Sequence, residues 1–133
     1  MSSSSAWTVD VGVLDLTLPT VEENLAVDEA LLVAADTRGG GAVLRFWEQP
    51  NAAVVLGASR RIAADARVGP CAADGVPIVR RSSGGGSVLI GPGALNVTLV
   101  LPIAADPALA TVNGAQHAVM ERLAAGVRRG GPA

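Results

Sequence analysis

A run of three glycines between two segments of strand-forming residues limits the folds open to this chain. In the stretch VRRSSGGGSVLIGPGALN, Val79–Asn96, a β-branched segment and two arginines precede the glycines, and a second apolar segment follows them. A dinucleotide-binding loop has its glycines where a strand leads into a helix, and a Walker loop needs a lysine, which this sequence does not contain. Since the residues after the glycines have strand composition and include a Gly-Pro-Gly turn, the sequence excludes both of these phosphate loops.

A glycine loop between two strands can still bind an anion. Consecutive glycines allow positive φ and carry no side chains, so that backbone N–H groups can converge on the oxygens of a ligand. Arg80 or Arg81 can add a guanidinium, but successive strand residues face opposite sides, so only one of the two points into a given cleft. From these residues alone, an anion-binding loop and a loose hairpin remain equally open.

Helical patterns occur in three parts of the chain. Thr20 and Glu23 form a capping-box pattern that starts a helix running to about residue 36, and Gly39–Gly41 follow it. A connector over 59–75 is expected to be helical in pieces, with a break at Gly69–Pro70, and a last helix is expected over 111–129.

Strand patterns fill most of the remaining chain. Alternation and β-branched residues predict strands at 9–18, 42–50, 52–57, 76–81 and two within 87–102, where a turn at 91–93 separates them. We expect the segment 52–57 to be the short antiparallel neighbour of 42–50. Strands joined by short turns favour an α+β fold with an antiparallel or mixed sheet and helices on a face.

Composition and charge narrow the classes of function. The 133 residues are 50% apolar and 17% charged, which fits a single domain with one core. The net charge is −2 and no basic run exceeds two residues, so we expect no nucleic-acid-binding surface. The N-terminal segment has no basic region and carries Asp10 and Asp15, so we expect no membrane partner. The single cysteine fits a reducing compartment, and the simplest interpretation is a cytoplasmic protein.

Isolated reactive residues have structural explanations. Cys71 is interpreted as a small, inert thiol, His117 as a surface residue of the last helix, and Arg60–Arg61 as a solvated pair. The acidic residues of the first helix are interpreted as its capped, solvated face: Glu22, Glu23, Asp28 and Glu29. No metal site is predicted, because no His, Cys and Asp residues have metal-ligand spacing.

Three segments in the same order resemble the lipoate-protein ligase family, within the wider group of biotin and lipoate protein ligases. They are ENLAVDEALL, LRFWEQPNAAVVLG and GVPIVRRSSGGGSVLIGPGALNVTLVLP, which together extend from about Glu23 to Pro102. The resemblance implies an α+β fold, a mixed, largely antiparallel sheet with helices packed on one side, as in class II aminoacyl-tRNA synthetase cores. It also implies that this fold is incomplete here, with the N-terminal part of the catalytic domain at 9–128. From their own composition, residues 1–8 are expected to be a disordered lead and residues 129–133 a tail.

The resemblance further implies a two-step reaction. In this family, lipoate or octanoate reacts with ATP, with Mg²⁺ as cofactor, to give an acyl-AMP, and the acyl group then passes to a lysine of a carrier. The implied partners are lipoyl carrier domains of 2-oxoacid dehydrogenase complexes or the glycine cleavage H protein. The residues implied to bind the nucleotide or acyl-adenylate are Arg81, Gly86, Ser87, Val88 and Leu89. Those implied to support the loop or pocket are Gly84, Gly85, Gly57 and Asn96.

The sequence departs from the family pattern at two points. Ile90–Gly91 stand where many members have a His-Asp pair, and the catalytic lysine of the family belongs to a later segment. We therefore expect no catalytic residue in this chain, which is interpreted as an N-terminal fragment of a ligase or the product of a truncated gene. A fragment is favoured over a complete enzyme without lysine. Two alternatives remain: an octanoyltransferase that uses a downstream cysteine without ATP, and a non-catalytic module that binds lipoyl-AMP or a carrier domain.

Overall fold

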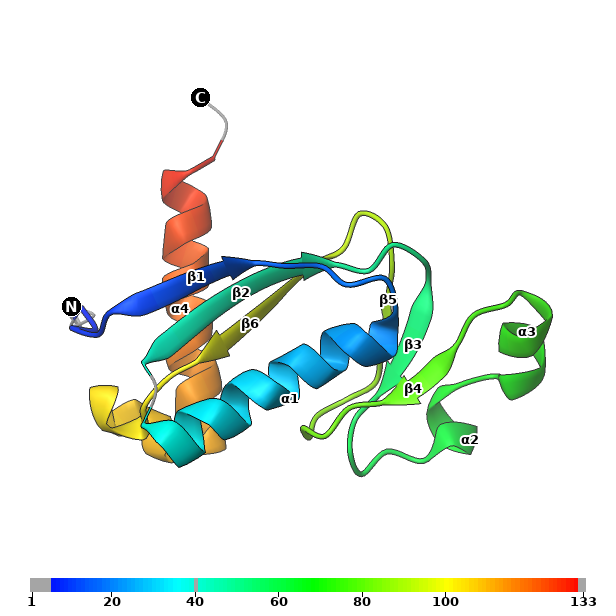
Figure 1. The fold of residues 1–133 in the computed structure, drawn as a ribbon, viewed down its shortest axis with the longest axis horizontal. Helices are drawn as coiled ribbons and strands as arrows, with labels where there is room; N and C mark the ends of the chain where they lie inside the picture. Colours follow the sequence, from blue (N-terminus) through cyan, green and yellow to red (C-terminus); the bar gives the residue numbers. More distant parts are fainter. Residues whose placement is uncertain (1–5, 40, 132–133) are drawn as a thin grey trace. The chain divides into compact units, whose positions relative to one another are not determined.

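The computed structural model describes residues 6–39 and 41–131, which form two compact units (Figure 1). One unit is Val11–Val100, and the other combines the residues up to Asp10 with those from Leu101 onward. All the predicted nucleotide-binding and loop-supporting residues belong to the Val11–Val100 unit, which is described first.

The first sheet of this unit has three strands in the order β1–β2–β6. The central strand β2 (Ala42–Glu48) pairs in parallel with β1 (Val11–Asp15) and antiparallel with β6 (Leu95–Val100). The strand predicted at 9–18 is therefore shorter than expected. It ends early because the backbone N–H and carbonyl of Leu18 bond to the side chain of Asn24, at 2.8 and 2.9 Å, and not to a neighbouring strand.

Helix α1 (Val21–Arg38) lies along one face of this sheet (Figure 1). The predicted capping box is confirmed, since the Thr20 side chain accepts from the Glu23 backbone N–H and the Glu23 side chain accepts from the Thr20 N–H. Gly39 ends the helix with φ of 60°, a left-handed conformation that glycine adopts at little cost. Local sequence signals therefore fix both ends of α1.

The second sheet has the order β4–β3–β5. Its central strand β3 (Ala53–Leu56) pairs in parallel with β4 (Ile78–Arg80) and antiparallel with β5 (Val88–Ile90). The predicted pairing of β2 with β3 is wrong, because both edges of each strand are occupied by other strands. The mixed α+β fold is confirmed, but its described strands form two three-stranded sheets, and the turn at 91–93 joins strands of different sheets.

The connector between β3 and β4 contains two short helices, α2 (Ile62–Asp65) and α3 (Val68–Ala73). The predicted break at Gly69–Pro70 is wrong, since α3 runs through both residues. Pro70 occupies the first turn of α3, where a missing N–H removes no helical hydrogen bond. The chain is extended at Ala66 and Arg67 instead, between the two helices.

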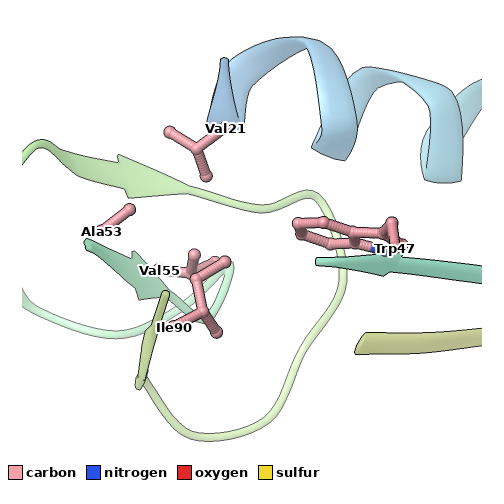
Figure 2. Close-up of a cluster of buried hydrophobic side chains, with 5 residues drawn as sticks. All are labelled: Val21, Trp47, Ala53, Val55 and Ile90. Carbon is pink, nitrogen blue, oxygen red and sulfur yellow. The ribbon is translucent and has the colours of Figure 1, made fainter. Parts of the chain in front are cut away.

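A small apolar core joins α1 to both sheets of this unit. Figure 2 shows its five buried side chains, which are Val21, Trp47, Ala53, Val55 and Ile90. Trp47 is the only aromatic residue among them, and it comes from β2, whereas three of the others come from β3 and β5. Because the remaining members are small, the single indole contributes much of the apolar area that links the two sheets.

The second unit contains helix α4 (Val112–Arg129) and two short 3₁₀ helices, η1 (Ile103–Ala105) and η2 (Pro107–Ala110). Trp7 donates its indole N–H to Asp106 Oδ2 at 2.7 Å, and the Arg122 guanidinium stacks 3.7 Å from the centre of its ring. Residues 1–5 of the predicted lead and residues 132–133 of the predicted tail lie outside the described residues. Among the helices described in either unit, none has the length and apolar character needed to cross a membrane.

Candidate functional site

The loop between β4 and β5 folds around one guanidinium. Arg81 donates its backbone N–H to the carbonyl of Leu56, and its Nη2 donates to the carbonyls of Gly84 at 2.8 Å and Gly86 at 2.7 Å. Gly85, between these two carbonyls, has φ of 97°, which an L side chain rarely adopts. The Nε and Nη1 atoms of Arg81 have no partner among the described residues.

In this loop, residues 82–87, backbone carbonyls form hydrogen bonds within the protein but backbone N–H groups do not, among the described residues. The carbonyls of Ser83, Gly84 and Gly86 all accept hydrogen bonds from other parts of the protein. In contrast, no backbone N–H of residues 82–87 donates to any acceptor in the described part of the chain. A glycine loop that turns its carbonyls to the protein and leaves its N–H groups free can donate them to an anion.

A second segment, the turn formed by residues 57–60, packs directly against the loop. A Cβ atom added to Gly57 would lie 2.0 Å from the carbonyl oxygen of Gly85, which only a missing side chain permits. Beside it, the Ala58 N–H donates to Ser83 O at 2.9 Å. Arg80 Nη1 donates to the carbonyls of Gly57, Ala58 and Arg60, so this arginine braces the turn. Arg80 thus donates to the 57–60 turn, whereas Arg81 donates to the glycine loop.

The far end of the loop is held by an acidic side chain. Ser87 donates its hydroxyl to Asp65 Oδ2, and Arg60 forms a bidentate ion pair with the same carboxylate at 2.7 Å for both contacts. These hydrogen bonds, from Arg60 first and Ser87 second, hold the pKa of Asp65 well below its ordinary value of 3.8. The Arg60 side chain is 48% exposed, as expected of a solvated residue, but its ion pair with Asp65 was not predicted.

Two adjoining hollows, here called the α1–loop groove, open beside the loop. They have volumes of about 240 and 250 Å³, and the residues common to both are Leu25, Asp28, Arg81, Val97 and Thr98. The first is also lined by Trp47, Val55, Val88, Ile90 and Asn96. The second adds Glu29, Leu32, Ser82, Ser83, Leu99 and Val100. The groove therefore combines one guanidinium and two carboxylates, those of Asp28 and Glu29, with many aliphatic walls. Because Asp28 is paired with Arg45, the guanidinium and the aliphatic walls suit a ligand with an anionic head and an apolar chain.

Of the nine predicted site residues, three line this groove: Arg81, Val88 and Asn96. The other six line neither hollow, and they are Gly57, Gly84, Gly85, Gly86, Ser87 and Leu89. The Asn96 amide also donates to the carbonyl of Trp47 at 3.3 Å, whereas Leu89 is 70% exposed. A larger cavity of about 500 Å³ lies near the start of α1 and near Asp74–Pro77, and none of the predicted residues line it.

A buried polar network adjoins the groove through Asp28, and sequence reasoning missed it. Arg45 is fully buried on β2, and it donates to the carbonyls of Leu16 and Asn24 and to the side chains of Asn24 and Asp28. Asn24 is fully buried as well and donates to Gln49. The interpretation of Asp28 as a solvated helix residue is wrong, because its carboxylate lies 2.6 Å from Arg45. The available signal was a single arginine within the apolar strand AVLRFW.

No described residues form a group of three or more His, Cys, Asp or Glu side chains that could hold a metal ion. The donors at and beside the groove include the Arg81 guanidinium and the N–H groups of residues 82–87, which have no acceptor among the described residues. Such a donor set binds an anion, and a divalent cation arriving with a nucleotide is ordinarily held mainly by phosphate oxygens and water.

Two relatives among curated proteins and two solved structures are similar to this chain. A protein of Aeropyrum pernix with the provisional name lipoate-protein ligase A is 33% identical over 102 residues, covering 75% of this chain and 38% of the relative. An octanoyl-[GcvH]:protein N-octanoyltransferase of Kyrpidia tusciae is 42% identical over 88 residues, covering 62% and 29%. The chain thus spans well under half the length of either relative.

The two structures are similar in fold over about seven tenths of this chain. A lipoate-protein ligase A bound with ATP has a TM-score of 0.64 at 27% identity, covering 69% of this chain and 37% of that one. A bipartite lipoate protein ligase of Thermoplasma acidophilum, studied with its E2 lipoyl domain, has a TM-score of 0.60 at 26% identity, covering 70% and 36%. The model of the lipoyl protein ligase A/B catalytic domain matches residues 20–129, and the chain belongs to this family.

Proposed function

We propose that the α1–loop groove binds the acyl-adenylate of a lipoate-protein ligase reaction. The observation that carries this proposal is the hydrogen bonding of Arg81 in the loop. Its Nη2 donates to the carbonyls of Gly84 and Gly86, whereas its Nε and Nη1 have no acceptor among the described residues. The N–H groups of residues 82–87 likewise have no acceptor in the part of the chain that the structure describes. An acyl phosphate placed here would find charge-assisted donors already in position, while its acyl chain would lie among the aliphatic walls.

In the proposed reaction, a carboxylate oxygen of lipoate attacks the α-phosphorus of ATP, which gives lipoyl-AMP and releases pyrophosphate. The amine of a carrier lysine then displaces AMP and forms the amide. Both steps build negative charge around the same phosphate, so Arg81 and the loop would stabilise it throughout. ATP is the proposed cosubstrate and Mg²⁺ its proposed cofactor, and octanoate is an alternative acyl group of the same length.

The proposed partners are lipoyl carrier domains of 2-oxoacid dehydrogenase complexes or the glycine cleavage H protein, in the cytoplasm. The printed names of two of the similar proteins support this, since one was studied with its E2 lipoyl domain and the other acts on octanoyl-[GcvH]. No lysine occurs among the 133 residues, so the residues proposed here bind and orient the adenylate, and none is assigned as catalytic.

Octanoyl transfer without ATP is the second candidate, and the 42% identical relative favours it. The test has two arms that use the 133-residue chain and a lipoyl carrier domain. One arm supplies ATP, Mg²⁺ and lipoate, and the other supplies an octanoylated carrier protein without nucleotide. Carrier modification in the ATP arm supports the ligase, and modification in the other arm supports the transferase. Binding of lipoyl-AMP without modification in either arm would mean a non-catalytic module.

A further inference from the structure

The glycine loop has a second anchor, at the end opposite to Arg81, that the proposed function does not use. Ser87 is the last residue before β5, and its hydroxyl donates to Asp65 Oδ2 at the end of α2. Ser87 lines neither hollow of the α1–loop groove, whereas its neighbour Val88 does. The Ser87 side chain is therefore engaged by α2 and does not line the groove.

We propose that Ser87 and Asp65 form a latch, a hydrogen bond that fixes the glycine loop in one conformation before the adenylate binds. Both are therefore positioning residues. This inference rests on the proposed function for its ligand, but the latch itself is a property of the free protein. Without it, the loop would be held by the Arg81 side chain at Gly84 and Gly86 and by the contacts of Gly57 and Ala58. Ser87, which joins the loop to β5, would then have no side-chain hydrogen bond among the described residues.

The arrangement around Asp65 is suited to a permanent anchor. Arg60 binds both oxygens of the carboxylate, and Arg80 holds the carbonyl of Arg60, so that strand β4, the 57–60 turn, α2 and the loop form a closed circuit of hydrogen bonds. The lowered pKa of Asp65 means that the carboxylate is charged in the folded protein even below pH 3.8. The contribution of the latch is thus present above the unfolded-state pKa and is lost as the pH falls through the lower folded value.

A fixed loop matters because its N–H groups are useful only if they point at the same place. Residues 82–87 include three glycines, which have the largest backbone freedom to lose when a ligand binds. If the latch removes that freedom before binding, the adenylate meets a preorganised site and binds more tightly. A looser loop would retain Arg81 and the groove but lose this advantage.

The test is a comparison of NMR order parameters for the backbone amides of Gly84–Gly86 in the unliganded chain, with four variants. For the wild type we expect order parameters near 0.85, typical of rigid backbone, and for Ser87→Ala values below about 0.6. Ser87→Thr keeps the hydroxyl and should restore rigidity. Asp65→Ala should loosen the loop as Ser87→Ala does. Arg61→Ala is the control, because the side chain of this neighbouring arginine has no hydrogen bond or ion pair in the described residues, and the backbone carbonyl that accepts from Ala64 and Asp65 is kept.

The second readout is the affinity for lipoyl-AMP, which should fall about fivefold to tenfold in Ser87→Ala and recover in Ser87→Thr. Unchanged order parameters in Ser87→Ala, in a chain with wild-type circular dichroism, would overturn the latch. A loosened loop with unchanged affinity would also overturn it as a positioning device. If the wild type itself binds no lipoyl-AMP, the proposed function fails, and the order parameters still decide whether the latch exists.

Discussion

Replacement of Arg45 by methionine is expected to lower the free energy of unfolding by about 3 kcal/mol. Methionine has a similar length, but it cannot donate hydrogen bonds to Leu16 O, Asn24 O or the side chain of Asn24, and these acceptors are buried or partly buried. It also leaves the Asp28 carboxylate without the guanidinium that lies 2.6 Å away. Buried acceptors without donors and a carboxylate without its cation lower the free energy of unfolding strongly. The loss of the cation–π contact with Trp47, at 5.2 Å, lowers it only a little further.

Urea denaturation measures this effect as a shift of the midpoint at unchanged slope. Arg38→Met is the matched control, since Arg38 is exposed in the last turn of α1 and should change the midpoint little. Arg45→Lys keeps the charge but not the fork of donors, so its stability should fall between wild type and Arg45→Met. A midpoint for Arg45→Met equal to that of Arg38→Met would contradict the assigned role of the network.

Replacement of Gly57 by alanine is expected to displace the glycine loop and to abolish measurable binding of lipoyl-AMP. The new Cβ would lie 2.0 Å from Gly85 O and 3.0 Å from Gly85 C, and neither backbone atom can give way without moving the loop. The 3.2 Å approach to Arg60 Cγ adds a smaller conflict that a flexible side chain can relieve. Overpacking of this kind costs about 1–3 kcal/mol, so the variant should still fold.

Calorimetry with lipoyl-AMP and urea denaturation would be applied to Gly57→Ala and to a control, Gly69→Ala. Gly69 lies in α3 with open space around its added Cβ, so alanine there should leave binding unchanged and slightly raise stability. Wild-type affinity in Gly57→Ala would show that the contact between the turn and the loop has no part in binding.

Elements that depend on neighbouring residues could be predicted from the sequence. The capping box at Thr20 and the glycine at the end of α1 both act within one turn of helix, and the structure contains them. The strands were also found, because alternation is a local pattern. Strand pairing is different: β2 could pair with β3 by proximity, but β1 and β6 occupy its edges, and β6 lies about fifty residues further on. Only the packing of the whole chain decides between such partners.

The same distinction separates what was found at the site from what was missed. The glycine loop and Arg81 were indicated by a contiguous motif, and the structure places Arg81 at the groove. Arg45, the partner of Asp28, lies 17 residues away, and Ser87, one of the two partners of Asp65, lies 22 residues away. No periodicity connects either pair. A charged residue inside an apolar strand was the one visible hint, since burial of an arginine requires partners for its donors.

Calorimetric titration of lipoyl-AMP into the 133-residue chain tests the adenylate site most directly, with Arg81→Ala and Arg61→Ala titrated beside the wild type. We expect one binding site in the wild type and in Arg61→Ala, and affinity about tenfold to a hundredfold weaker in Arg81→Ala, because charge-assisted hydrogen bonds to the phosphate are lost. Equal affinity in wild type and Arg81→Ala, or no binding by a wild-type chain shown to be folded, would contradict the assignment of the glycine loop as an acyl-adenylate site.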